Sequence, residues 1–183
     1  MRKILLILMA FIPVAVFPQL KIKVGGMVFE ETNETYKVYT FDGLSAGELF
    51  DRCKNTLLSM TVDLDDMSSE NKDKMIVVNG KSYGDCSYKY MGQTVLSDID
   101  YTIRIRFKDG RMRIDAPVFQ KVTSGNVLVK FEKGGLMKDG YGNAFKKNGE
   151  PRLKDLIISI ENYFNNIYDG LIKGISDNTE DDW

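Results

Sequence analysis

Residues 100–115 read Asp-Tyr-Thr-Ile-Arg-Ile-Arg-Phe-Lys-Asp-Gly-Arg-Met-Arg-Ile-Asp, and this stretch decides the fold. Asp109-Gly110 predicts a two-residue β-hairpin turn of type I′, because both residue types tolerate a positive φ. A loop of that length fixes the register, so Lys108 should face Arg111. Side chains alternate along a strand, so one face of the hairpin is apolar and needs a cover. That face comprises Tyr101, Ile103, Ile105, Phe107, Met112 and Ile114.

The opposite face of the predicted hairpin is cationic. Asp115 is the only acid expected on it, and like charges directly opposite one another are unfavourable. Two interpretations follow: a solvated sheet face offset by acids of neighbouring strands, for which Asp85 is a candidate, or an anion-binding site. The candidate ligand-binding residues of this face are Arg104, Arg106, Lys108, Arg111 and Arg113.

Residues 132–149 are rich in lysine and glycine and have no hydrophobic periodicity. We expect a long loop, which in a compact domain is either mobile or functional. Lys138 and Tyr141 belong to its mixed cationic and aromatic group and are further candidates for ligand contact. The alternative is a flexible surface loop. No Gly-Lys-Ser/Thr sequence closes a phosphate-binding loop here.

Two amphipathic helices are expected. The first begins at a capping box, Ser45 to Glu48, and its apolar stripe runs to about Met60 and includes Cys53. The second begins near Pro151 and ends near Gly170 or Gly174, with apolar residues at three- and four-residue steps over about twenty residues. Its stripe comprises Leu153, Leu156, Ile157, Ile160, Phe164, Ile167 and Leu171.

Other segments predict strands, turns and one polar loop. Residues 27–40 read as strand material broken by a polar turn, and 127–131 as a further strand. Asn79-Gly80 predicts a second type I′ turn, between strands 75–78 and 81–91. Residues 61–74 are acid-rich without the EF-hand spacing, so we expect a solvated loop and no metal site. Pro117 predicts a strand end or edge.

The termini differ from the rest of the chain. Arg2 and Lys3 followed by a thirteen-residue apolar run predict a signal peptide over residues 1–18, hence an exported protein in the periplasm, outer envelope or extracellular space. No transmembrane segment is expected after processing; the alternative is an uncleaved anchor over the same residues. We expect one domain over residues 19–175 and a disordered acidic tail over 176–183.

Composition excludes several classes of function. Without Arg2 and Lys3 the 25 basic residues fall to 23 against 26 acidic ones, a net charge of −3, which does not favour nucleic-acid binding. The chain has no histidine to activate a nucleophile, so no catalytic residue is assigned. Cys53 and Cys86 could form a disulfide or pack separately in the core. No cofactor is expected.

The order of predicted elements is that of an α+β domain, with two helices on one face of a single antiparallel sheet. At this point the chain resembles a known family. The runs Tyr39–Phe50 and Tyr101–Ile114, with the export signal, resemble a domain of unknown function with a TBP-like fold from exported proteins of Bacteroidetes. The resemblance implies a β-α-β-β-β-β-α order and an envelope location. It carries no catalytic residues.

The sequence therefore predicts a non-catalytic binding or assembly module. Its partner would be an anionic glycan, a lipid head group or an acidic surface of an envelope protein, bound through the cationic sheet face. Two alternatives stay open. One is a glycan hydrolase that uses carboxylates alone. The other is self-association through a strand edge or the open sheet face.

Overall fold

The computed structural model describes residues 19–60, 64–71, 74–135 and 141–177, which form two helices and ten strands. The signal peptide predicted for residues 1–18 lies outside them. The helices are α1 (Ala46–Ser59) and α2 (Lys154–Asp177). The strands are β1 (Leu20–Lys23), β2 (Gly26–Phe29), β3 (Tyr36–Thr40), β4 (Leu64–Asn71), β5 (Met75–Tyr90), β6 (Gln93–Lys108), β7 (Arg111–Asp115), β8 (Val118–Ser124), β9 (Val127–Lys133) and β10 (Tyr141–Phe145).

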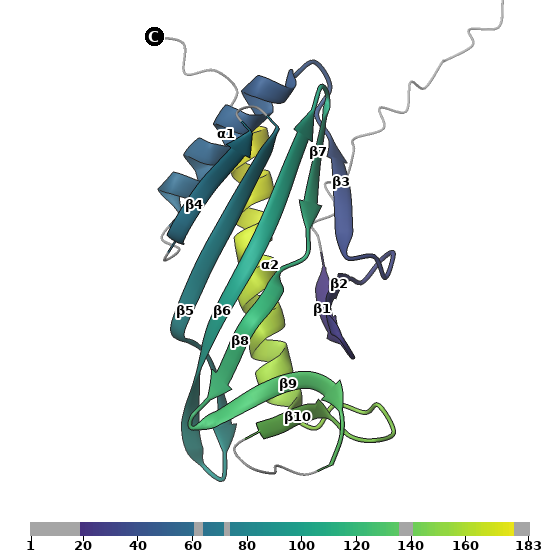
Figure 1. The fold of residues 1–183 in the computed structure, drawn as a ribbon, viewed down its shortest axis with the longest axis vertical. Helices are drawn as coiled ribbons and strands as arrows, with labels where there is room; N and C mark the ends of the chain where they lie inside the picture. The colour runs from purple at the N-terminus through teal and green to yellow at the C-terminus, as the bar shows by residue number, and fades with distance from the viewer. Residues whose placement is uncertain (1–18, 61–63, 72–73, 136–140, 178–183) are drawn as a thin grey trace, which may run out of the picture.

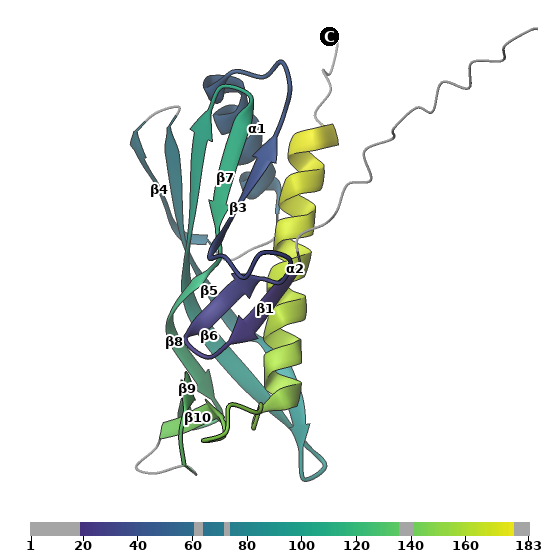
Figure 2. The ribbon, with the colours of Figure 1, turned by 90° about the vertical axis from the view of Figure 1, so that its right-hand side faces the viewer.

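The described strands form two sheets (Figure 1). In the larger sheet the order is β10-β9-β8-β6-β5-β4. Strand β7 pairs with the last residues of β6, beyond those that pair with β8, and β3 pairs with the other edge of β7. Strands β7 and β8 therefore follow one another along the same edge of β6. Both helices lie on one side of this sheet (Figure 2), as expected for the α+β fold.

The expectation of a single antiparallel sheet is wrong. Strands β1 and β2 form a separate sheet, because α2 side chains rather than another strand bind the outer edge of β1. Glu161 accepts a hydrogen bond from the backbone N–H of Ile22 (2.8 Å), and Asn165 accepts one from that of Leu20 (2.7 Å). Strand β10 runs parallel to β9. Three strands precede α1 among the described residues, so the implied β-α-β-β-β-β-α order is wrong as well.

The hairpin of β6 and β7 has the predicted register, from Lys108 opposite Arg111 to Ile105 opposite Ile114. Its apolar face is buried, as expected. The turn is not type I′, since only Gly110 has a positive φ (68°). Contacts with the start of α1 hold this turn: Asp109 accepts a hydrogen bond from Ala46 N (2.9 Å), and Gly110 N donates one to the Leu44 carbonyl (2.8 Å).

The second predicted turn, Asn79-Gly80, is wrong: both residues lie inside the sixteen-residue strand β5. The ring of Tyr101 occupies the space above Gly80, where an added Cβ would lie 2.3 Å from the ring Cζ. The chain turns instead at Met91-Gly92, where both φ values are positive (48° and 80°), as type I′ requires.

The two helices cover the core. The capping box of α1 is present: Ser45 N donates to the Glu48 carboxylate (2.7 Å), and Ser45 Oγ accepts from Glu48 N (3.3 Å). Helix α2 has 24 residues and, at 1.5 Å per residue, is about 36 Å long. It continues through Gly170 and Gly174, contrary to expectation, because at Gly174 the missing side chain leaves room for Thr56 of α1.

Three further segments differ from expectation. Residues 64–71 are strand β4 rather than a loop, paired with β5. The segment 132–149 contains the end of β9 and all of β10, so it is not one long loop. Helix α2 starts after Pro151, which forms an isolated bridge with Phe145, and extends to residue 177, into the predicted tail. The rest of the tail lies outside the described residues.

Cys53 and Cys86 are both buried and free. They pack singly in the core, the second of the two interpretations that the sequence allowed. Among the described residues, no helix is long and apolar enough to cross a membrane.

Candidate functional site

The basic side chains of β6 and β7 alternate with buried apolar ones, so they project from the sheet face opposite the helices. In Figure 1 this face of the ribbon is toward the viewer. Lys74 lines the same cavity as several of these side chains, and its carbonyl accepts a hydrogen bond from Phe107 N (2.9 Å) at the end of β6. The apolar alternate residues are buried under the helices, which fixes the direction of the charged ones. We call this set the cationic face: Lys74, Arg104, Arg106, Lys108, Arg111 and Arg113.

Asp115 offsets two of these charges. Its carboxylate accepts hydrogen bonds from Arg106 Nη1 (2.7 Å) and Arg113 Nε (2.8 Å). The guanidinium of Arg113 also lies over the ring of Tyr36, with Cζ 3.8 Å from the ring centroid. These contacts hold both arginines in position, and their side chains stay about two-fifths exposed. The acid suggested by the sequence, Asp85, lies at the far half of β5, whereas Met75 at its beginning pairs with Arg106.

Among the described residues, the other cations of this face have no such carboxylate partner. Lys108 and Arg111 lie directly opposite one another at the end of the hairpin, and both are exposed. Asp109, between them in sequence, directs its carboxylate to the Ala46 amide of α1. Within the described part of the chain no carboxylate forms an ion pair with Lys108, Arg111 or Arg104. Because like charges face each other here, a bound anion would relieve their repulsion.

An open cavity of about 1040 Å³ lies against this end of the sheet. Basic side chains from three segments line it, together with the exposed Val38 of β3. Its lining residues are Val38, Ala46, Lys74, Arg106, Phe107, Lys108, Asp109, Arg111 and Arg113.

The structure separates the candidate residues into two places. The five on the hairpin come together on the cationic face. Tyr141 begins β10 at the opposite end of the molecule (Figure 1), where Lys130 lies over its ring at 5.0 Å. Lys138 lies outside the described residues. Sequence reasoning missed Lys74 and Tyr36, which reach the face only through the pairing of β5 with β6 and of β3 with β7.

The titratable groups with shifted pKa values lie elsewhere. Burial raises the pKa of Asp169 on α2, and burial together with the charge of Asp169 raises that of Tyr39 on β3. Asp169 Oδ1 and the Tyr39 hydroxyl are both buried, and neither has a hydrogen-bond partner within the part of the chain that the structure describes. Burial also raises the pKa of the Cys53 thiol and brings that of Cys86 to about 12. Among the described residues, no cluster of carboxylate or thiol side chains could hold a metal ion.

The comparison with family models gives no match, and the comparison with curated proteins gives none either. Among solved structures, the chain is similar to a TBP-like protein from Parabacteroides distasonis, at 14% identity and a TM-score of 0.45, covering 78% of this chain and 91% of that one. It is also similar to a DUF4468 family protein from Bacteroides ovatus, at 14% identity and a TM-score of 0.48, covering 89% and 90%. Both are of the kind that the sequence resemblance named, and the likeness concerns the fold alone.

Proposed function

We propose that this chain is a non-catalytic, exported module that binds a ligand carrying several oxyanions on its cationic face. The single observation that carries the proposal is the pair Lys108 and Arg111, two exposed cations opposite one another without a carboxylate partner among the described residues. Phosphate, sulfate and carboxylate groups are complementary to such a pair, because hydrogen bonds from charged donors are stronger than neutral ones.

The arrangement of the face favours a ligand with repeated charges. Arg104, Arg106 and Lys108 alternate along β6, so their Cα atoms are about 7 Å apart. Arg106 is fixed by Asp115, while its two neighbours are free to contact a ligand. A row of this kind suits a sulfated or uronic glycan or a cluster of phosphate head groups better than one small ion.

Binding can be measured with two probes that share this chemistry, a heparin-derived hexasaccharide and vesicles containing phosphatidylglycerol. The test variant replaces Lys108 and Arg111 with Gln. Loss of two charged donors should weaken binding at least about tenfold, or about 1.4 kcal/mol. Binding to the unchanged chain should also weaken as salt rises, because exposed charges are screened.

The control variant carries Lys54→Gln and Lys89→Gln, the same change in charge at exposed residues of α1 and of the far end of β5. It should bind like the unchanged chain. The two probes distinguish a glycan from a lipid surface as the source of the anion. Equal weakening in both variants, or none in the first, would show that the cationic face is not the site.

A further inference from the structure

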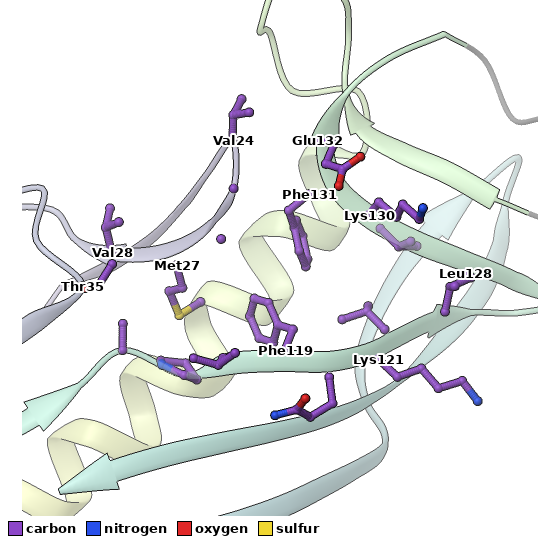
Figure 3. Close-up of a pocket in the computed structure, with 18 residues that line it drawn as sticks. Val24, Met27, Val28, Thr35, Phe119, Lys121, Leu128, Lys130, Phe131 and Glu132 are labelled. Carbon is purple, nitrogen blue, oxygen red and sulfur yellow. The ribbon is translucent and has the colours of Figure 1, made fainter.

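A second cavity, of about 590 Å³, lies between β2, β8 and β9 (Figure 3). Apolar side chains from these three strands point into it, and Phe119 packs on Phe131 with ring centroids 5.0 Å apart. Phe119 also packs on Phe164 of α2, at 5.6 Å, so the helix supports the floor. Of the floor residues, Met27, Ala116, Val122, Val129 and Phe131 are buried and Phe119 is partly buried.

The cavity exists because the sheet is incomplete at this point. Strand β8 pairs with β6 from Val118 to Ser124, but with β9 only at Thr123 and Ser124. Beyond those two pairs β9 diverges and stays paired on its other side with β10. The edge of β8 from Val118 to Val122 therefore has no neighbouring strand within the described part of the chain.

This edge presents backbone groups to the cavity. Ser124 and Val127 close the two-residue turn at Gly125-Asn126, so Ser124 directs its N–H and C=O toward β9. The N–H and C=O groups of successive residues point to alternate sides of an antiparallel strand, so those of Val122 point to the same side as those of Ser124. At Val122, however, β9 no longer pairs with β8. A strand edge with free donors and acceptors is a template for another extended chain.

The β1–β2 hairpin forms the opposite wall. Gly25 N donates a hydrogen bond to the Phe131 carbonyl (2.7 Å), which holds the tip of the hairpin against β9. The outer edge of β1 is bound by α2, so β2 is the strand that faces the cavity. Polar main-chain edges thus surround an apolar floor.

We propose that this cavity binds an extended segment of a partner polypeptide, which adds to the edge of β8 as a strand. Only another backbone offers donors and acceptors at the spacing of a strand, and its alternate side chains would fill the apolar floor. An acyl chain would fill the floor but leave the edge of β8 without partners. Pro117 lacks an N–H, and Gln120 is an extra residue in the pairing of β8 with β6, so the edge that a partner strand can follow runs at most from Val118 to Val122.

The probe is a set of fluorescent nine-residue peptides in which Val or Leu alternates with Thr or Lys, with binding to the full chain followed by anisotropy. Each binding peptide is remade with N-methyl groups on every second residue, in either of two registers. Methylation in the register that faces β8 should weaken binding at least tenfold. Methylation in the other register should change it less than twofold.

Blocking the cavity supplies a second readout. Val118 and Val38 are each 48% exposed, and only Val118 lines this cavity. Each is replaced with Cys and modified with a bulky maleimide, which leaves Cys53 and Cys86 unmodified because they are buried. The label at position 118 should abolish peptide binding, and the label at position 38 should leave it unchanged. Thermal unfolding before and after labelling verifies that both variants stay folded.

Register-dependent loss of binding together with blocking at position 118 supports the proposal. Absence of binding by the whole set, equal effects of the two methylation registers, or equal blocking at position 38 overturns it. A monomer–dimer equilibrium that the label at 118 abolishes would assign the cavity to a second copy of this chain instead. Displacement of the peptides by dodecanoate, without any effect of methylation, would assign it to an acyl chain.

Discussion

Replacement of Gly80 by Ala tests the contact that keeps Asn79-Gly80 inside a strand. An added Cβ at this position would lie 2.3 Å from Tyr101 Cζ and 2.4 Å from the Tyr101 hydroxyl oxygen. Favourable carbon–carbon separations are about 3.5 to 4.0 Å, so the ring must move by about 1.2 Å. Tyr101 is 1% exposed and packs edge-on against Phe164, with centroids 4.8 Å apart. The ring therefore moves only if α2 moves with it.

Two opposing effects determine how Gly80→Ala changes the free energy of unfolding. Overpacking of a filled core costs up to about 3 kcal/mol. Removal of a glycine from a strand interior returns about 0.5 to 1 kcal/mol. We expect Gly80→Ala to lower the free energy of unfolding by about 2 kcal/mol. For a chain of this length that corresponds to a melting temperature lower by about 4 to 8 °C.

Urea denaturation followed by circular dichroism measures this difference. Gly135→Ala is the matched control, because a Cβ there meets nothing within 4 Å. It should stay within about 1 kcal/mol of the unchanged chain. If Gly80→Ala unfolds at the same urea concentration as the control, the ring of Tyr101 does not require a glycine beneath it. The account of why this Asn-Gly pair forms no turn would then be wrong.

Three further predictions follow from the surroundings of single residues. Asp115→Asn removes the carboxylate between two partly exposed arginines, so urea denaturation should show a free energy of unfolding lower by about 1 kcal/mol. The same change should tighten binding of the heparin hexasaccharide, and weaker binding would contradict the proposed site. Burial raises the pKa of Asp169 above its ordinary value of 3.8, so the folded state loses stability as the pH rises from 3.8 to the raised pKa. Asp169→Asn should therefore raise the unfolding temperature at pH 7 and should not raise it below pH 3.8. Cys53 and Cys86 should not react with a thiol reagent in the folded chain and should both react in urea, because burial raises the pKa of each thiol; modification without denaturant would contradict their burial.

The sequence predicts the hairpin of β6 and β7 well because its signals are local. Alternation fixes which side chains are buried, and a two-residue loop fixes the register. The type of turn is wrong because non-local contacts decide it. Asp109 binds the Ala46 amide and Gly110 the Leu44 carbonyl, contacts to a segment more than sixty residues earlier that no turn preference contains.

Asn79-Gly80 shows the same limit more clearly. The pair has the strongest turn preference in its region, whereas Met91-Gly92 has a weak one. The cross-strand neighbour decides between them: Gly80 pairs with Tyr101, whose ring needs the space. Glycine marks either a turn or a close approach, and the sequence does not distinguish the two without the pairing partner.

The candidate site was predictable only in part, because alternation along a strand is local whereas the pairing of strands is not. The five basic residues of the hairpin share a face by alternation alone. Their surroundings depend on which strands pair with β6 and β7, so Lys74 and Tyr36 were missed. Asp115 was expected on this face, but the additional acid suggested there, Asp85, lies elsewhere on β5. Tyr141 was a candidate only through the mixed cationic and aromatic character of residues 132–149, and β10 lies at the other end of the sheet.

Both proposed surfaces depend on the break between β7 and β8, two strands that pair one after the other with the same edge of β6. After β7 the chain passes through Ala116 and Pro117, and Pro117 has no N–H to continue a ladder. One part of the edge of β6 thus carries the cationic hairpin and the next carries β8 with its free outer side. Lys108 lies six positions along β6 from Thr102, which is opposite Val118, or about 20 Å away. Sites so far apart on one continuous strand should act independently, so an oxyanion ligand and a strand-forming peptide can bind together without coupling.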